Sequence, residues 1–326
     1  MRRVVFALSF ATFVAFAGSR VTLGQSRGNG NPFIDHSDTG ETIHVLPAPA
    51  AIHSPHDTQP TDAPPRNALN VYPASYGSGN LINHGGHQIP FAGFFAIYWN
   101  STVANSAGSQ GQTSLRSQVA DFATHFSDGV AYSQSDTAAD YTIVTQYSAA
   151  DTISPVLAFA GDYVDSRAAQ SSFSDTKVKN YIASLFNSGV VTPDPNTIFG
   201  MYFPAGMRIT LQGGASCSSF CGYHGHFAYN GQDIKYAVFP YTNCAACSLP
   251  GKAVADMLTI VSSHEIREAV TDPDLNAWYD AAGDEAVDKC AWHNLYQMTR
   301  GNYWVQPEYS NGGTSTYPGP GCVVPQ

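Results

Sequence analysis

Three stretches of the chain carry apolar residues at the three- and four-residue spacing of a helix face. Side chains at this spacing lie on one side of a helix, so each stretch is predicted to be helical and to bury that side. The stretches are residues 113–126, residues 175–187, and the segment from Pro250-Gly251 to about Val270. Asp175 is placed to cap the second helix, and Asn187-Ser188-Gly189 is placed to end it.

Other stretches are rich in β-branched and aromatic residues, as strands are. They predict strands at residues 90–99, Tyr141–Tyr147, Thr197–Phe203, 226–230 and 233–240. Asn230-Gly231, between the last two, predicts a hairpin turn. Strands and helices are interspersed from residue 89 to residue 326, which predicts one α/β or α+β domain with a mixed sheet and flanking helices.

The first residues have the pattern of a secretory signal peptide. Arg2 and Arg3 precede an apolar run from Val4 to Phe16, and Ala15-Phe16-Ala17 is a small-x-small cleavage pattern. The run is shorter than the ~20 apolar residues of a membrane span, which argues against the alternative of an N-terminal anchor. Residues 1–24 are therefore predicted to be a signal segment, with cleavage expected after Ala17, and the protein is predicted to be secreted.

Residues 25–88 are rich in Pro, Gly, Asp and His and show little apolar periodicity. Such a composition does not bury enough apolar surface to fold alone, so this segment is predicted to be a flexible leader. The whole chain has a net charge of −10, and removal of residues 1–24 takes away three arginines and no acid, which gives −13. This acidic balance argues against a nucleic-acid partner.

The six cysteines all lie in the C-terminal part of the chain. An even number of cysteines in an exported chain predicts disulfides. Spacing suggests the pairs Cys217 with Cys221, Cys244 with Cys247, and Cys290 with Cys322. A zinc site made by the first four cysteines is the alternative, and an oxidising compartment argues against it.

The segment His264-Glu265-Ile266-Arg267-Glu268 carries the strongest sign of chemistry. His264 and Glu268 are four residues apart on a predicted helix, so they share a face and can bind one ion. Glu265 then lies where the glutamate of His-Glu-x-x-His enzymes acts as general base on a zinc-bound water. Glu268 replaces the second histidine, which adds negative charge and makes a bound water less acidic.

A further ligand would come from elsewhere in the chain. Glu285 and Asp288 are candidates, together with Asp280. His224 and His226 are also candidates, because residues two apart on a strand point to the same side. The alternative is a purely structural role, in which His224 packs beside the Cys217–Cys221 loop and hydrogen-bonds to a carboxylate.

Calcium is the alternative ion, at a second cluster of oxygen donors. Asp272, Asp274, Asn276, Asp280 and Asp284 follow the predicted last helix. Their spacing is not that of an EF-hand loop, so a solvated turn is the competing interpretation. Nucleophilic catalysis has less support, since the chain has no Gly-x-Ser-x-Gly segment and its cysteines are assigned to disulfides.

The C-terminal part of the chain resembles the EXORDIUM and phosphate-induced protein 1 family. The segments that carry the resemblance are Cys221-Gly222-Tyr223-His224, Cys244 to Cys247, His264 to Glu268, Thr271-Asp272-Pro273, Asn276-Ala277-Trp278-Tyr279 and Glu285 to Cys290. The resemblance extends over roughly residues 84–322, and the leader departs from the family pattern. It implies an extracellular, often cell-wall-associated protein, and it marks His224, His264, Glu265, Glu268, Glu285 and Asp288 as candidate positions.

The leading hypothesis is a secreted, zincin-like metalloprotein. If it is an enzyme, we expect a zinc-dependent peptidase that acts on peptides. His264 and Glu268 would be ligands, Glu265 the general base, and His224, Glu285 or Asp288 would complete the site. The rival is a non-catalytic extracellular module that uses the same residues as a buried polar network. A third hypothesis is binding of a cell-wall polymer through Trp278, Tyr279, Trp292 and Tyr303.

Overall fold

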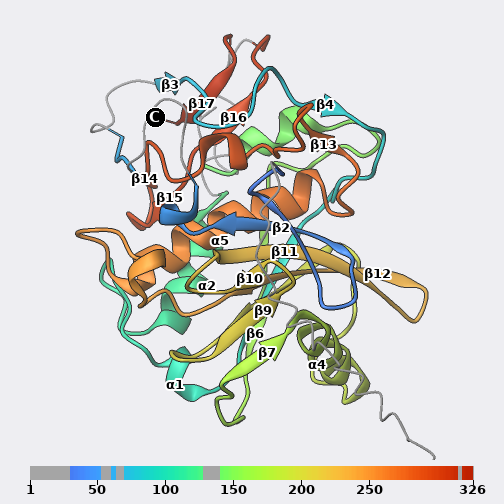
Figure 1. The fold of residues 1–326 in the computed structure, drawn as a ribbon, viewed down its shortest axis with the longest axis vertical. Helices are drawn as coiled ribbons and strands as arrows, with labels where there is room; N and C mark the ends of the chain where they lie inside the picture. The colour runs from blue at the N-terminus through green and yellow to red at the C-terminus, as the bar shows by residue number, and fades with distance from the viewer. Residues whose placement is uncertain (1–29, 53–59, 64–69, 128–139, 315–317, 326) are drawn as a thin grey trace, which may run out of the picture.

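The computed structural model describes residues 30–52, 60–63, 70–127, 140–314 and 318–325, and its centre is a seven-stranded mixed sheet (Figure 1). In spatial order the strands are β1 (Ile34–His36), β2 (Thr42–Pro47), β11 (Phe220–Tyr229), β12 (Gln232–Phe239), β8 (Thr197–Tyr202), β5 (Gly93–Tyr98) and β6 (Ala158–Val164). Pairing from β12 to β6 is parallel, and pairing from β1 to β12 is antiparallel. The predicted mixed sheet is confirmed.

Two helices cover opposite faces of this sheet. The Phe186 ring of α4 (Asp175–Asn187) lies 5.0 Å from the Phe199 ring of β8. On α5 (Val254–Thr271), the Ser262 hydroxyl lies 2.8 Å from the Tyr202 hydroxyl of the same strand. Phe199 and Tyr202 are three residues apart on a strand, so they point to opposite faces.

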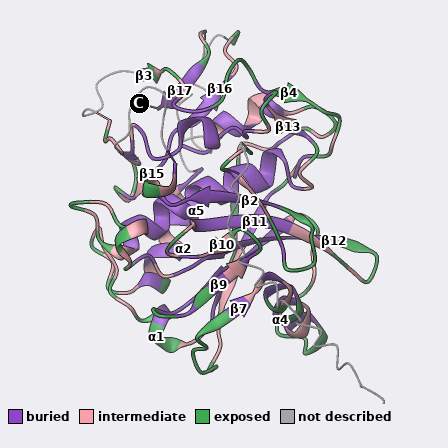
Figure 2. Cartoon of the chain, viewed as in Figure 1, coloured by how far each residue is buried: buried purple, intermediate pink, exposed green. Residues whose placement is uncertain are grey.

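Helix α5 is enclosed on all sides. Every residue after Val254 is buried, including the polar ones (Figure 2). The sheet lies on one side of α5, and the C-terminal segments and α2 (Leu115–His125) contact it elsewhere. A polar side chain in such a helix is cut off from water, so it needs a partner inside the protein.

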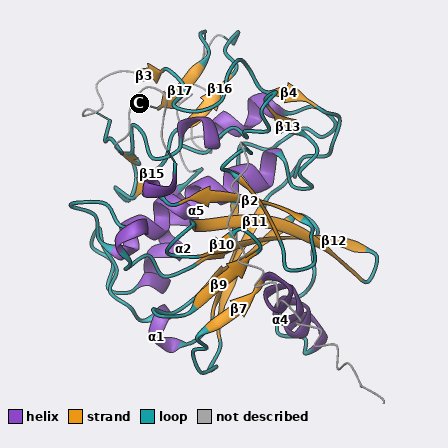
Figure 3. Cartoon of the chain, in the orientation of Figure 1, coloured by secondary structure: helices purple, strands orange, loops and turns teal. Residues whose placement is uncertain are grey.

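The remaining elements are short (Figure 3). The strands are β3 (Asn70–Tyr72), β4 (Ile82–Asn83), β7 (Ser172–Ser174), β9 (Arg208–Leu211), β10 (Gly214–Ala215), β13 (Trp278–Tyr279), β14 (Tyr296–Gln297), β15 (Trp304–Val305), β16 (Glu308–Ser310) and β17 (Gly321–Val324). The helices are α1 (Ser101–Ala104) and the 3-10 turns η1 (Pro49–Ala51), η2 (Thr142–Tyr147), η3 (Ala245–Cys247) and η4 (Asp288–Cys290). Most of the C-terminal part is therefore loop, and this loop region contains Glu285 and Asp288.

Most of the predicted elements are present. The three predicted helices correspond to α2, α4 and α5, and the predicted hairpin is β11–β12, where Asn230 and Gly231 have φ of 48° and 78°. The strand predicted at Tyr141–Tyr147 is wrong, because η2 occupies these residues. Ile143, Val144 and Tyr147 are the buried residues of this turn, a spacing that fits helical rather than alternating burial.

The flexible leader predicted for residues 25–88 is wrong for the described part of that segment. Strand β2 lies inside the sheet between β1 and β11, and its residues from Ile43 to Pro47 are buried. Pairing with β11 hides the apolar side chains of β2. The predicted signal segment lies outside the described residues. No helix among the described residues has the length and apolar character that a bilayer span requires.

Three disulfides staple the fold, and only one of the suggested pairs is right. Cys290 bonds to Cys322 as predicted, but Cys217 bonds to Cys244 and Cys221 bonds to Cys247. The local pairs fail because β11 and β12 are antiparallel. The residues just before β11 therefore lie beside those just after β12. With all six cysteines in disulfides, the alternative of a four-cysteine zinc site is also wrong.

Candidate metal centre

Two neighbouring strands supply histidines to the face of the sheet that α5 covers. His44 of β2 and His224 of β11 are directly opposite in the antiparallel register, so their side chains lie on the same face. Gly222 lies on that face too. A Cβ there would come within 2.3 Å of Val261 Cγ1 and 2.8 Å of Glu265 Oε1, so the missing side chain lets α5 approach the strand closely.

Helix α5 supplies three more polar side chains to the same place. His264 and Glu268 are one turn apart, and His264 Nε2 lies 3.0 Å from Glu268 Oε2. Glu265 lies against β11, near Gly222. All three side chains are completely or almost completely buried.

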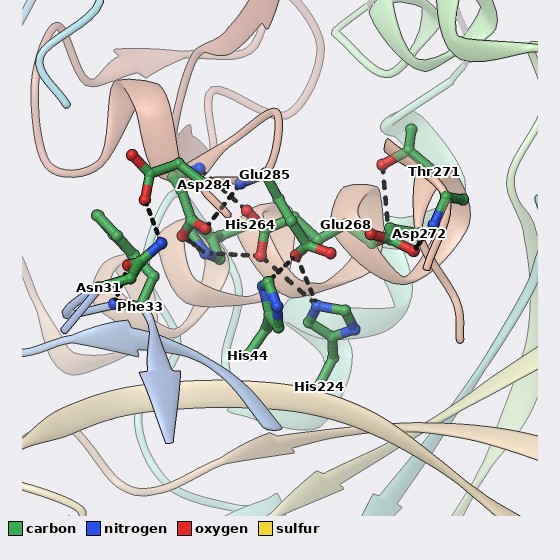
Figure 4. A network of polar contacts seen from close by, with 12 residues as sticks. Asn31, Phe33, His44, His224, His264, Glu268, Thr271, Asp272, Asp284 and Glu285 are labelled. Carbon is green, nitrogen blue, oxygen red and sulfur yellow. Dashed lines mark hydrogen bonds and ion pairs between the residues drawn. The ribbon is translucent and has the colours of Figure 1, made fainter. Parts of the chain in front are cut away.

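The loop after α5 returns the carboxylates of Glu285 (Figure 4) and of Asp288 to the helix. Asp272 ends the helix, and its Oδ1 accepts hydrogen bonds of 2.6 Å from the N–H groups of Asn276 and Ala277, which tightens the turn. The backbone N–H of Asp288 donates to Glu268 Oε1 at 3.0 Å. The backbone N–H of Glu285 donates to Asp288 Oδ2, also at 3.0 Å.

The donors form two groups of three that have no residue in common. In the first group, His264 Nε2 lies 3.0 Å from Glu268 Oε2 and 3.5 Å from Asp288 Oδ1. In the second group, Glu285 Oε2 lies 3.1 Å from His44 Nδ1 and 3.0 Å from His224 Nε2. We call these the α5 group (His264, Glu268, Asp288) and the β2 group (His44, His224, Glu285). The donor atoms of each group lie within 4.8 Å of one another.

Many of these buried atoms have no hydrogen-bond partner among the described residues. They are His44 Nδ1, His224 Nδ1, His264 Nε2, both carboxylate oxygens of Glu265, Glu268 Oε2, Glu285 Oε1 and Asp288 Oδ1. His264 Nε2 and Glu268 Oε2 are close enough for a hydrogen bond, but their directions do not form one. Atoms that converge without bonding to each other are what a shared ion or water would satisfy.

Charge sets a strict condition on the centre. With neutral imidazoles and ionised carboxylates, Glu265, Glu268, Glu285 and Asp288 give it a formal charge of −4. An uncompensated charge of this size is very costly away from water. Protons or cations must therefore neutralise it.

Without a metal, protons do this. Burial raises the pKa of Glu265 and of Asp288 well above the usual value, which favours the neutral form of both carboxyl groups. Burial opposes charge on His44 and His264, but nearby carboxylates raise both imidazole pKa values, that of His44 to about 10 through Glu285. Burial opposes charge on Glu285 as well, and His44 and His224 nevertheless lower its pKa. The centre is thus neutral with four added protons, or with two divalent cations.

Gln306 fixes the tautomer of His264. Its Nε2 lies 2.9 Å from His264 Nδ1 and donates to the Val287 carbonyl, and its Oε1 accepts from the backbone N–H of Trp292. With the amide in this orientation, a neutral His264 accepts at Nδ1 and has its ring proton on Nε2. Binding of a metal at Nε2 requires the amide to turn over, so that Oε1 accepts from Nδ1–H, as in the second shell of known zinc sites.

The centre is closed. Each of its side chains is buried, and two surface cavities, of about 760 and 520 Å³, are lined by other residues. Structural zinc sites are closed in this way, whereas catalytic sites keep a position open to substrate.

The structure brings together all the principal residues predicted from the sequence, and adds two. Glu265 and the five predicted ligands His264, Glu268, His224, Glu285 and Asp288 meet in one place. His44 and Gln306 were not predicted. A strand-like run, Thr42 to Pro47, was the available signal for His44, but the composition of its surroundings outweighed it.

Other candidates lie apart from the centre. His226 pairs with Asp233, and Asp274 accepts from Lys235. Two acids of the predicted calcium cluster have separate partners, since Asp280 pairs with Lys289 and Asp284 accepts from Asn31, whereas Asp272 ends α5 close to Glu285 and His44. Calcium there stays a prediction.

The aromatic residues predicted to bind a wall polymer differ in exposure. Trp292 and Tyr303 are buried in the core. Trp278 and Tyr279 are half-buried, and the Tyr279 ring stacks on His84 at 3.7 Å. Of these four aromatic residues, only Trp278 and Tyr279 are placed to reach a ligand at the surface.

Comparison with protein-family models, with curated proteins and with solved structures gave no match. The resemblance to the EXORDIUM and phosphate-induced protein 1 family therefore stays a prediction, and the geometry of the centre has to be interpreted on its own.

Proposed function

We propose that this chain is an extracellular metalloprotein that binds zinc in the α5 group, with His264, Glu268 and Asp288 as protein ligands. The observation that carries the proposal is the convergence of His264 Nε2, Glu268 Oε2 and Asp288 Oδ1, all buried and all without a hydrogen-bond partner in the described chain. A divalent ion would satisfy the three atoms together.

The chemistry of the donors favours zinc. Zinc is commonly bound by imidazole nitrogen with carboxylate oxygen at about 2.0–2.2 Å, whereas calcium takes oxygen ligands only. An extracellular location is supported by the signal-like N-terminal sequence and by the three disulfides.

The closed geometry favours a structural role for this ion. His264 and Glu268 belong to α5, and Asp288 belongs to the long loop that follows it. An ion at this place would fasten the loop to the helix, as the Cys290–Cys322 disulfide fastens the same region to the C-terminal strand β17.

Hydrolysis is the second candidate, and one observation favours it. Glu265 has two partnerless buried oxygens beside Glu268 and His224, the place of a general base in a zinc hydrolase. This activity would require an opening of the loop over α5. Glu265→Gln would then abolish peptide hydrolysis and leave the zinc content unchanged.

Elemental analysis of the tag-free protein tests the proposal. The wild type is expected to contain zinc, and His264→Ala and Asp288→Asn are expected to lose the ion of the α5 group. His87→Ala, a substitution of an exposed histidine, is the matched control and should retain it. A wild type that takes up no zinc from an excess of the metal would overturn the proposal.

A further inference from the structure

The β2 group has the makings of a metal site of its own. His44 Nδ1, His224 Nε2 and Glu285 Oε2 lie within 4.8 Å of one another. His44 is 5% exposed, and His224 and Glu285 are fully buried. These three residues come from β2, β11 and the loop after α5, so the fold and not a local motif assembles them.

The hydrogen bonds of the β2 group leave donor atoms without partners. Glu285 Oε2 bonds to His224 Nε2 at 3.0 Å, but Glu285 Oε1 has no partner among the described residues. His44 Nδ1 lies 3.1 Å from Glu285 Oε2, yet the two atoms do not form a hydrogen bond. A buried imidazole nitrogen that lies 3.1 Å from a carboxylate oxygen without bonding to it points to a third participant.

The charge of the centre allows more than one divalent ion. A single zinc ion in the α5 group balances two of the four negative charges of Glu265, Glu268, Glu285 and Asp288, so two protons or a second cation must balance the rest. A second divalent ion in the β2 group makes the centre neutral. The two groups share no residue, so both ions can have their own three protein donors.

Glu265 lies between the two groups. Its carboxylate, His224 Nε2 and a Glu268 oxygen also lie within 4.8 Å of one another, and His224 Nε2 is 3.7 Å from Glu268 Oε2. Glu265 therefore lies near one donor of each group, and both of its carboxylate oxygens are without a partner among the described residues.

We propose that the centre binds two zinc ions, the second held by His44, His224 and Glu285 with Glu265 between the ions. This inference rests on the proposed zinc site of the α5 group. It gives the N-terminal segment a function: β2 carries a ligand into the centre, so the second ion ties this segment to α5 and its following loop.

The experiment measures zinc per chain in the full-length secreted protein, stripped with a chelator, reloaded by dialysis against zinc and freed of loosely bound metal. We expect two zinc ions in the wild type, one in His44→Gln, and two in His36→Gln. The last is the matched control, because His36 is an exposed histidine of the neighbouring strand β1.

Each result has a definite meaning. One zinc ion in the wild type overturns the second site and leaves the proposed function standing, and no zinc in the wild type overturns both. Two ions in His44→Gln overturn the role of His44. If His44→Gln does not fold, a cobalt titration of the wild type decides, since its visible absorption should saturate at two equivalents and saturation at one would contradict the inference.

Discussion

Two histidines of the same strand show how differently one fold treats a histidine–carboxylate cluster. His224 and His226 are two residues apart on β11 and point to the same face. His226 Nδ1 lies 2.9 Å from Asp233, and Lys235 donates to both Asp233 and Asp274. That cluster is half-buried and contains its own cation.

The centre around His224 contains no lysine or arginine among its donors and is sealed from water. Arg267, next to Glu268 in sequence, points away and donates to the carbonyls of Gln306 and Asp140. The half-buried carboxylate cluster around His226 is balanced by a side-chain cation, Lys235. The buried cluster must be balanced by protons or metal ions.

The largest effect should come from removing metal from the buried centre. Zinc at a concentration 1,000-fold above its Kd stabilises the folded state by about 4 kcal/mol. Chelation should therefore lower the melting temperature by roughly 10 °C. Calorimetry with and without chelator measures this, and readdition of zinc should restore the transition. An unchanged transition would mean that the buried centre, like the His226 cluster, does not depend on a metal ion.

A smaller effect is expected from filling the gap between β11 and α5. Gly222→Ala places a methyl group against Val261 and Glu265, so the helix or the strand must shift, at a cost of about 2 kcal/mol. Zinc affinity should fall with it. Gly319→Ala is the matched control, because a Cβ at that position meets no described atom within 4 Å. Equal urea midpoints for the two variants would refute the close approach.

The pH dependence of stability should separate protons from metal as the balancing charge. In the metal-free protein, burial disfavours charged His44, but Glu285 raises its pKa to about 10, against about 6.5 in the unfolded chain. The folded state thus binds the proton more tightly. The stabilisation is complete below about pH 6.5 and is lost as the pH rises towards 10.

Zinc-loaded protein should show the opposite trend over the same interval, because protons compete with zinc for the imidazole nitrogens. Urea unfolding at about pH 6 and about pH 9, with and without zinc, measures both slopes. Identical slopes in the two preparations would mean that zinc does not replace the protons of the centre.

The smallest effect is expected at the exposed cluster. His226→Gln removes a surface ion pair with Asp233, whose contribution is within about 1 kcal/mol. The zinc content should not change. A loss of zinc in this variant would show that the half-buried cluster, and not the buried one, binds the metal.

Local patterns predicted the parts of the site that lie on one helix. The spacing of His264 and Glu268 fixes their common face once α5 is recognised, and the apolar residues of α5 make it recognisable. The approach of Glu285 and Asp288 depends on a long loop, which only the tertiary structure specifies. The sequence indicated them only as acidic residues that follow the predicted last helix.

The N-terminal segment shows what composition hides. Prolines and polar residues dominate residues 25–88, so the short apolar run containing His44 carried little weight. Its burial comes from pairing with β11, a strand some 180 residues later in the chain, roughly the separation of His44 and His224. The periodicity of a short segment does not indicate which distant strand it pairs with.

The correct disulfide pairs could have been predicted from the hairpin, but the short spacing between cysteines suggested other pairs. The hairpin at Asn230-Gly231 was predicted, and its antiparallel pairing already places residues near Cys221 beside those near Cys247. Proximity along the chain was the weaker guide, because Cys221 on β11 bonds to Cys247 and Cys217, in the turn before β11, bonds to Cys244.

Anomalous diffraction at the zinc absorption edge, from crystals of the zinc-loaded protein, tests the central claim most directly. The account predicts strong peaks inside the buried centre, one among His264, Glu268 and Asp288 and one among His44, His224 and Glu285. A map with no peak in the centre, or with zinc only at the His226 cluster, would contradict it.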